Sequence, residues 1–274
     1  MKGSTFDPSA CRKLYAARLE ADLRRFAPFL AYEPRMEFYI RLAAETGQLA
    51  PGKFLVDLGC GLSLFGLLCR MYGPEVACVD DFGGGGGIAP GGVTALPPLL
   101  EWAKDAHGMR FDSMDFIETP LPFGSGSVDL VTCFHSLEHW HHSPRRLFSE
   151  IVRILKPGGS LILATPNAAN LRKRLFLLGG KSNFPELKEW YFDGDPVFRG
   201  HVREPVLQDL ENLMVWNGLR ITNRQGRNFI GEDSIALSFL PKTIVRLLAR
   251  ASEGFLRLFP TLCSDLHVVG KKPG

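Results

Sequence analysis

The sequence predicts an α/β fold in which helices cover both faces of a parallel sheet. Short apolar segments of strand length alternate along the chain with segments of helical length. One junction is especially informative, because residues 54–66 read FLVDLGCGLSLFG, an apolar run that ends in Gly-x-Gly before a new apolar segment. Glycines there permit a sharp turn and a close approach of a ligand, and the following helix begins with unpaired N–H groups. The sequence therefore predicts a nucleotide-sized site at this turn.

The composition is that of an ordinary globular protein. The chain has 274 residues, of which 45% are hydrophobic and 22% charged, enough for one domain with embellishments or two small domains. A net charge of +3 is too small to indicate a nucleic-acid partner. Six cysteines without a CxxC pair indicate reduced thiols. The charged N-terminus, and the lack of any run of about twenty apolar residues, favour a cytoplasmic protein.

The predicted elements follow in order along the chain. Residues 8–47 have helical spacing, with a second helix expected over Pro34–Thr46. Five strands are expected at Phe54–Leu58, Val76–Val79, Met109–Asp112, Val128–Phe134 and Ser160–Ala164. The helices between them are expected at Leu62–Met71, Leu96–Ala106 and Pro144–Leu155. The segment KPGG, residues 156–159, predicts a sharp turn that leads into the fifth strand.

The alternation ends after the segment TPN, residues 165–167. A basic apolar stretch and an aromatic loop follow, and they predict an insertion after the fifth strand. The fold then resumes with a helix at Glu204–Asn217, a strand at Arg220–Gln225, an amphipathic helix at Pro241–Phe259 and a final strand at Ser264–Gly270.

Acidic side chains near the glycine turn indicate the kind of ligand that it binds. A dinucleotide site has the pattern G-x-G-x-x-G, but here Leu64 replaces the third glycine. Asp57 places negative charge two residues before Gly59, which disfavours a diphosphate and suits a cationic or zwitterionic ligand. Asp80 follows the second strand, 23 residues after Asp57, where a carboxylate can accept bonds from ribose hydroxyls. It is preferred over Asp81, and a loop acid or helix cap is the alternative interpretation.

The ends of the third and fourth strands supply further candidates. The carboxylate of Asp115 could accept from an adenine amino group, while Phe116 offers a backbone N–H and an apolar wall. The fourth strand ends at Phe134 and His135, and the carboxyl ends of strands are where open α/β sheets bind ligands. Taken alone, Asp115 is also an ordinary loop acid.

Histidines gather after the fourth strand, in the segment LEHWHH. His139 is the candidate general base, because the pKa of histidine lies close to physiological pH, with a structural hydrogen bond as the alternative. His139, His141 and His142 also raise the question of a metal. Three histidines on one loop seldom converge without a partner carboxylate, so we expect no metal site.

The order of these features resembles one family. The quoted segments are D-x-G-x-G at Asp57–Gly61, the acid after the second strand, DFIETPLPFGSGSVDLV, LEH, RILKPGG and TPN. Together they resemble the class I S-adenosylmethionine-dependent methyltransferases over residues 34–225, and most of all the small-molecule branch that includes the ubiquinone-biosynthesis O-methyltransferases and natural-product enzymes. The resemblance implies a Rossmann-like, mostly parallel seven-stranded sheet whose last strand, SDLHVVG, is antiparallel.

The resemblance also implies domain boundaries and residue roles. A helical cap is expected over residues 1–50, the cofactor-binding core over 51–167, an insertion that covers the substrate over 168–203, and the rest of the core over 204–274. The glycine turn would hold the amino-acid part of the cofactor, the acids after the second strand the ribose, and the loop after the third strand the adenine. The implied cofactor-binding residues are Asp57, Gly59, Cys60, Gly61, Asp80, Asp81, Asp115, Phe116 and the backbone near His135.

The sequence therefore predicts methyl transfer from S-adenosylmethionine to a small-molecule or lipid-linked acceptor. Oxygen is the favoured acceptor atom, with nitrogen and carbon open, and the cofactor product is S-adenosylhomocysteine. His139 is the candidate base and His201 the reserve. The alternatives are an NAD-dependent oxidoreductase and a non-catalytic, cofactor-binding scaffold. The identity of the acceptor and the oligomeric state stay open.

Segments outside the core give weaker indications about partners. Aromatic residues of the insertion could pack an apolar acceptor or a small satellite core. Basic residues could contact a membrane surface or an anionic acceptor, or form a solvated face, and these residues are Arg172, Lys173, Arg174, Arg246, Arg250 and Arg257.

Overall fold

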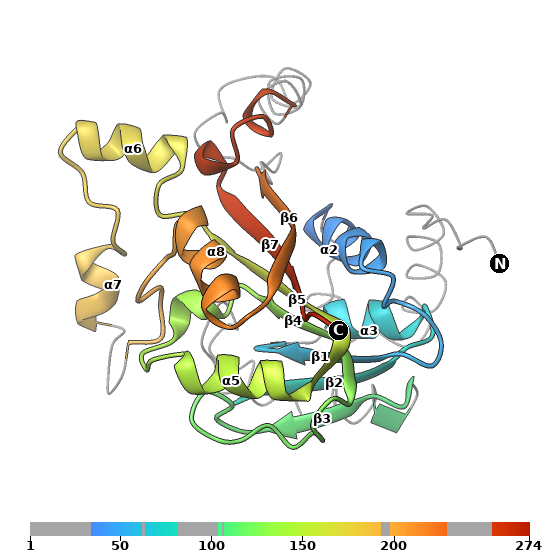
Figure 1. Ribbon diagram of the computed structural model, residues 1–274. Coiled ribbons are helices and arrows are strands. Elements are labelled where there is room, and N and C mark those ends of the chain that lie inside the picture. The colour runs from blue at the N-terminus through green and yellow to red at the C-terminus, as the bar shows by residue number, and fades with distance from the viewer. Residues whose placement is uncertain (1–33, 62–63, 82–103, 106, 193–197, 229–253) are drawn as a thin grey trace. The chain divides into compact units, whose positions relative to one another are not determined.

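The computed structural model describes residues 34–61, 64–81, 104–105, 107–192, 198–228 and 254–274 (Figure 1). The strands are β1 (Phe54–Leu58), β2 (Glu75–Asp80), β3 (Arg110–Ser113), β4 (Val128–Phe134), β5 (Leu155–Pro166), β6 (Arg220–Arg227) and β7 (Asp265–Lys271). The α-helices are α2 (Pro34–Glu45), α3 (Leu64–Arg70), α5 (Arg145–Ile154), α6 (Leu171–Leu178), α7 (Leu187–Phe192) and α8 (Leu207–Trp216). Two 3₁₀ turns are η2 (Leu137–His139) and η4 (Pro260–Leu262).

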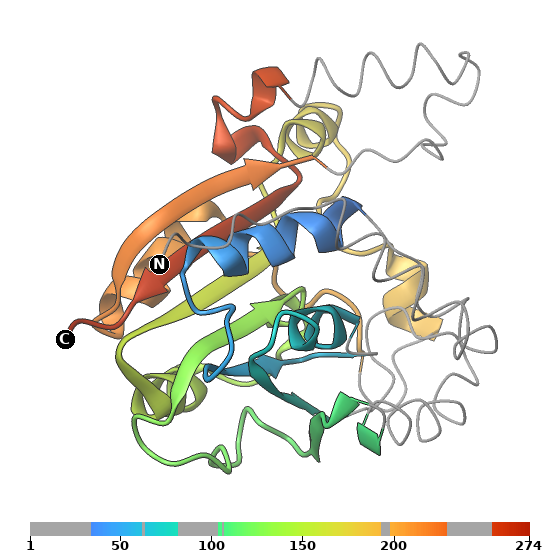
Figure 2. The ribbon, with the colours of Figure 1, turned by 90° about the vertical axis from the view of Figure 1, so that its right-hand side faces the viewer.

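The seven strands pair in the order β3-β2-β1-β4-β5-β7-β6. β1 is parallel to β2 and to β4, and β2 is parallel to β3. Asn167 N–H donates to the Ser264 carbonyl, and Lys272 N–H donates to the Gly159 carbonyl, so β7 runs antiparallel to β5. β6 and β7 also point in opposite directions in Figure 2. The predicted mostly parallel, seven-stranded sheet with an antiparallel last strand is confirmed, and its order reverses between β1 and β4, where open sheets of this kind bind ligands.

The chain divides into two compact units. The first comprises Met1–Phe134, His142–Ile162 and Lys271–Gly274, and the second comprises His135–His141 and Leu163–Gly270. The glycine turn therefore belongs to the first unit, and the predicted insertion and catalytic histidines belong to the second. The boundaries predicted at residues 50, 167 and 203 stay predictions.

The core of the first unit lies around β1, β2 and β4, whose side chains are almost all buried. This burial explains the near-continuous apolar runs in the sequence, because central parallel strands are covered on both faces. The Tyr39 ring of α2 stacks on Phe134 at the end of β4, with 4.2 Å between ring centroids, and Phe65 of α3 meets both rings edge-on. The helix predicted before β1 is thus present, and its aromatic side chains fasten it to the core.

An ion cluster joins the amino-terminal ends of β1 and β4. Asp129 is only 3% exposed, and its carboxylate accepts bonds from Lys53 Nζ at 3.0 Å, Lys156 Nζ at 2.6 Å and Phe54 N–H at 3.0 Å. Burial acts to raise the pKa of Asp129, but these donors outweigh it and lower the pKa overall. The cluster lies away from the glycine turn and serves stability.

Helices of the second unit expose much apolar surface. Leu171, Leu175 and Leu178 of α6 and Trp190 of α7 are all exposed. None of the helices in the described ranges is long and apolar enough to cross a membrane. The cysteines within those ranges form no disulfide.

Most predicted elements are confirmed to within a few residues, with one correction. The KPGG segment does not form a turn before β5, because residues 156–159 already belong to that strand. Gly158 N–H donates to the Lys272 carbonyl, so the ladder with β7 continues through the segment, and the positive φ of Gly158 (78°) accommodates the local bend. The helix expected before residue 34, and most of those at Leu96–Ala106 and Pro241–Phe259, lie outside the described residues.

Candidate functional site

The glycine turn of the first unit is open and bordered by carboxyl groups. Gly59 and Gly61 have φ angles of 68° and 52°, the left-handed region that glycine adopts without strain. Gly59 N–H donates to the Val79 carbonyl at 2.8 Å, and Gly61 N–H donates to Asp80 Oδ2 at 2.8 Å. A Cβ placed on Gly61 would meet no atom of the described residues within 4 Å. The turn is therefore tied to the end of β2, and the described part of the chain leaves room for a ligand on its outer side.

Asp57 lies on β1, buried beneath this turn. It is 3% exposed, and its Oδ1 accepts the Thr132 hydroxyl at 2.6 Å. Burial raises the pKa of Asp57 to about 7, the Thr132 bond lowers it in part, and the charge of Asp80 raises it further. The sequence predicts a negative charge here, but Asp57 is only partly ionised at neutral pH. A nearby cation would favour its ionised form.

The other predicted cofactor residues of the first unit take different positions. Asp80 is half-buried at the end of β2, whereas Asp81 is exposed, and the preference for Asp80 stays a prediction. Asp115 is exposed and caps its own loop, since its Oδ1 accepts the Ile117 N–H at 3.0 Å. Phe116 is buried. The neighbouring Met114 N–H donates to the Asp80 carbonyl at 2.9 Å, so this loop does lie beside the end of β2.

Cys60 stands between the two glycines and is not activated as a nucleophile. Desolvation raises the pKa of its thiol well above the ordinary value, and a hydrogen bond with Cys78 and the charges of Asp80 and Asp57 add to this effect. A thiol in this state fits a packing role beside the turn.

His135 begins the second unit in a strained conformation. Its φ is +50°, the one positive φ among the non-glycine residues in the described ranges. Its N–H donates to the Ala164 carbonyl at 2.8 Å. The ring lies between two acids, with Nδ1 3.4 Å from Glu138 Oε1 and Nε2 3.7 Å from Asp265 Oδ1. The predicted contact of its backbone with the cofactor stays a prediction.

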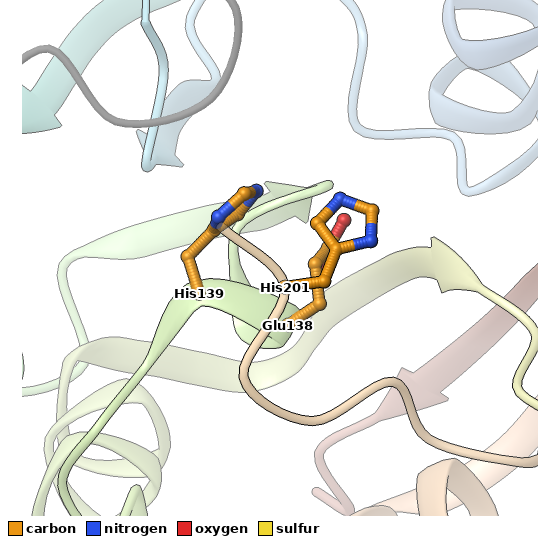
Figure 3. Close-up of side chains that lie close together, drawn as sticks. All are labelled: Glu138, His139 and His201. Carbon is orange, nitrogen blue, oxygen red and sulfur yellow. The ribbon is translucent and has the colours of Figure 1, made fainter. Parts of the chain in front are cut away.

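The two predicted catalytic histidines lie side by side in the second unit (Figure 3). The ring centroids of His139 and His201 are 4.9 Å apart, although 62 positions separate the residues. The Glu138 carbonyl accepts the N–H groups of Val202 at 2.7 Å and Arg203 at 3.2 Å, and these bonds fasten the 201–203 segment to η2. Sequence reasoning named both histidines but did not predict that they would meet.

Each of these rings is oriented by a partner on Nδ1. His139 Nδ1 lies 2.8 Å from the Arg199 carbonyl oxygen, and His201 Nδ1 lies 2.8 Å from Glu204 Oε1. Glu204 also pairs with Lys173. Burial lowers the pKa of His201, although the nearby Glu138 opposes this effect. His201 is therefore predominantly neutral at pH 7.

Glu138 completes a cluster that sequence reasoning missed. Its side chain is 0% exposed, and a carboxyl oxygen of Glu138 and a ring nitrogen of each histidine lie within 4.8 Å of one another. His141 instead contacts the Phe198 carbonyl at 2.5 Å, and His142 lies 3.6 Å from Glu118. The histidines of the LEHWHH segment thus do not converge, and the acid beside His139 in the LEH triplet was the signal available in the sequence.

A cavity of about 540 Å³ adjoins His201 within the second unit. It is lined by His141, Ser182, Phe184, Pro185, Leu187, Trp190, Phe198, His201 and Val202. Two aromatic residues of the predicted insertion, Trp190 and Phe198, line the cavity, whereas Tyr191 and Phe192 pair with each other and are exposed. The lining is mainly apolar with a few polar groups, as in sites for small organic ligands.

Comparison with known proteins places the chain in a family. A family model described as a methyltransferase domain matches residues 24–224. The chain belongs to this methyltransferase family. The family resemblance and the Rossmann-like α/β fold predicted from the sequence are therefore confirmed, and the match favours the methyltransferase prediction over the oxidoreductase alternative.

Individual relatives of the methyltransferase domain are distant. A ubiquinone biosynthesis O-methyltransferase of Xanthomonas oryzae pv. oryzae (strain PXO99A) is 28% identical over 135 residues, which cover 47% of this chain and 50% of the relative. A malonyl-[acyl-carrier protein] O-methyltransferase of Serratia marcescens is 29% identical over 129 residues, covering 46% and 44%. The chain thus spans about half the length of the curated relatives that it matches.

Solved structures share the fold of this methyltransferase domain. An S-adenosylmethionine-dependent methyltransferase from Mesorhizobium loti has a TM-score of 0.53 at 18% identity, covering 85% of this chain and 97% of that chain. Phosphoethanolamine N-methyltransferase 2 of Haemonchus contortus has a TM-score of 0.55 at 16% identity, covering 96% and 60%. At this level of identity the likeness shows the fold alone.

Proposed function

We propose that this chain transfers a methyl group from S-adenosylmethionine to an oxygen atom of a small-molecule or lipid-linked acceptor. The observation that carries the proposal is the open turn at Gly59–Gly61 with the carboxyls of Asp57 and Asp80 beside it. Two acids near the turn disfavour a diphosphate and favour a ligand with ammonium and sulfonium charges. The O-methyltransferase names of the distant relatives support oxygen as the acceptor atom.

The residues of the first unit fit such a cofactor. In this proposal the turn and Asp57 hold the amino-acid end, where the ammonium group would draw Asp57 into its charged form. Asp80, at the end of β2, accepts the ribose hydroxyls, and Asp115 with Phe116 holds the adenine. When bound, the cofactor supplies an electrophilic methyl group on a positively charged sulfur.

The protein has to align the acceptor and take up its proton. Methyl transfer is an in-line displacement in which the new O–C bond forms as the C–S bond breaks, so positioning contributes much of the catalysis. The Arg199 carbonyl can only accept a hydrogen bond, so Nδ1 of His139 carries hydrogen and Nε2 of the neutral ring is the basic nitrogen. A general base needs a nitrogen with an available lone pair, and Nε2 of His139 has one, so His139 is the proposed base. His201 is the reserve.

The cavity beside His201 is the proposed acceptor site, and residues 168–203 are the proposed substrate cover. Its aromatic lining suits an acceptor with an apolar body, and the histidines at its wall suit a hydroxyl group.

Peripheral contact with a membrane is a further part of the proposal. Arg172 and Arg174 of α6 are exposed beside exposed leucines, a combination that suits an anionic lipid surface. Lys173 is less suited, because it is engaged with Glu204. Arg246 and Arg250 lie outside the described residues.

Calorimetry and a transfer assay test the proposal. The full chain should bind S-adenosylhomocysteine and not NAD, and it should transfer a labelled methyl group to at least one member of a panel of hydroxylated apolar compounds. Binding of NAD alone would support the oxidoreductase alternative instead. Binding of S-adenosylhomocysteine with no transfer to any acceptor would support a scaffold role and overturn the catalytic part.

A further inference from the structure

Glu138 is a buried acid whose environment the protein leaves incomplete. It is 0% exposed, and neither carboxyl oxygen has a hydrogen-bond partner among the described residues. His135 Nδ1 lies 3.4 Å from Oε1 of Glu138, which is long for a direct hydrogen bond. An acid buried in this way is unfavourable unless something further binds it, since buried polar groups are normally satisfied.

The two neighbouring imidazoles are oriented as metal ligands are. In each ring Nδ1 faces an oxygen acceptor, the Arg199 carbonyl for His139 and the Glu204 carboxylate for His201. An Nδ1–H donated to a carbonyl or carboxylate fixes the tautomer and leaves the lone pair of a neutral ring on Nε2, which is the usual outer-sphere support of a histidine ligand. Lys173 in turn holds Glu204, so the orientation of His201 is reinforced.

We propose that Glu138, His139 and His201 bind a divalent transition-metal ion. One carboxyl oxygen of Glu138 and one ring nitrogen of each histidine lie within 4.8 Å of one another (Figure 3). With metal–ligand bonds of about 2.0–2.2 Å, two ligand atoms on one ion lie roughly 3–3.5 Å apart. Side-chain movements that shift the donor atoms by about an ångström would therefore close the site. The proposal departs from the sequence-based expectation of no metal, which grouped His139 with His141 and His142 instead of with Glu138 and His201.

The donor set indicates which ions suit the site. Two imidazole nitrogens and one carboxylate favour Zn²⁺, Fe²⁺, Co²⁺ or Mn²⁺, whereas Mg²⁺ and Ca²⁺ prefer oxygen ligands throughout. Three protein ligands leave at least one coordination position open, as in catalytic rather than structural metal sites. The ion also gives the buried Glu138 carboxyl a directly bonded partner, which it lacks among the described residues.

The site bears on the acceptor chemistry, and this part rests on the proposed function. His201 is shared by the cluster and the lining of the cavity, so the ion lies at the cavity wall. An acceptor hydroxyl bound at the open position would lose its proton to water more readily, because a metal ion lowers the pKa of a bound hydroxyl. With the ion bound, His139 acts as a ligand, and the ion takes over the activation of the acceptor.

Metal titration of the full chain tests the site without any methyl donor. After treatment with a chelator, calorimetry with Zn²⁺ and the visible absorption of added Co²⁺ should both report one equivalent bound, and Mg²⁺ should not compete. Glu138→Gln and His201→Gln should each weaken binding about 100-fold or more, and Glu204→Gln about 10–100-fold. The matched control His142→Gln, an exposed histidine outside the cluster, should leave the affinity unchanged.

Thermal unfolding separates loss of the site from loss of the fold. Zn²⁺ should raise the Tm of the wild-type chain and of His142→Gln, but not that of Glu138→Gln or His201→Gln, whose Tm without metal shows whether they fold. Absence of one-equivalent binding, or affinity unaffected by Glu138→Gln, would overturn the proposal and indicate that His135 alone balances Glu138. Asp80→Ala should weaken S-adenosylhomocysteine binding and leave metal binding unchanged, so a failure of the cofactor proposal can be told apart from a failure of the metal proposal.

Discussion

Replacing Asp57 with asparagine should stabilise the protein, by an amount that depends on pH. Burial raises the pKa of this carboxyl from 3.8 to about 7, so between these values the folded state holds a proton that the unfolded state has released. Folding stability therefore falls as pH rises from about 4 to about 7. The full penalty, about 4 kcal/mol, is present above pH 7. The asparagine side chain would carry no charge and would retain an oxygen to accept the Thr132 hydroxyl, which lies 2.6 Å from Asp57 Oδ1 in the wild type.

Urea unfolding at two pH values measures this effect. Asp57→Asn should be more stable than the wild type by about 4 kcal/mol at pH 8 and by about 2 kcal/mol at pH 5, because the unfolded-state carboxyl is mostly ionised at both values while the folded-state carboxyl is ionised only at the higher. The control Asp81→Asn removes an exposed acid near the same turn and should change stability by less than about 0.5 kcal/mol.

The same variant should lose affinity for S-adenosylhomocysteine, since a neutral amide cannot balance the ligand's ammonium group. Stability gained together with binding lost is the pattern expected of a residue kept for function at a cost in stability. The reasoning is refuted if Asp57→Asn is no more stable than the wild type at pH 8, or if the difference is the same at both pH values.

Three further predictions concern the first unit. Asp80→Ala should weaken S-adenosylhomocysteine binding by about 1–3 kcal/mol in calorimetry, with Asp81→Ala nearly unchanged; equal losses would reject the ribose assignment. Asp129→Asn should cost about 3 kcal/mol at pH 7 in urea unfolding, because two lysines lose their buried partner. Because the pKa of Asp129 is lowered by folding, the wild-type advantage should disappear as pH falls below about 4. Tyr39→Ala should cost about 3–5 kcal/mol by removing the ring stacked on Phe134, and a loss below about 1 kcal/mol would mean that α2 is not anchored there.

Local patterns were sufficient to predict the sheet and the glycine turn. β1 and β4 begin and end where the apolar runs do, because a strand buried on both faces needs a continuous apolar sequence. The turn was visible because positive φ angles at Gly59 and Gly61 require glycine. The KPGG segment misled, because its glycines permit both a turn and a bent strand, and only pairing with β7 selects the strand.

Tertiary structure decided two features of this protein. They are the protonation state of Asp57 and the formation of the Glu138–His139–His201 cluster. The sequence placed an acid at Asp57, but its pKa depends on how much water the fold excludes, which no neighbouring residue encodes. His139 and His201 are far apart along the chain and meet because the Glu138 carbonyl binds the backbone of Val202 and Arg203. Sequence periodicity specifies which residues share a strand or helix, whereas the joining of distant segments follows from packing and hydrogen bonds across the whole fold.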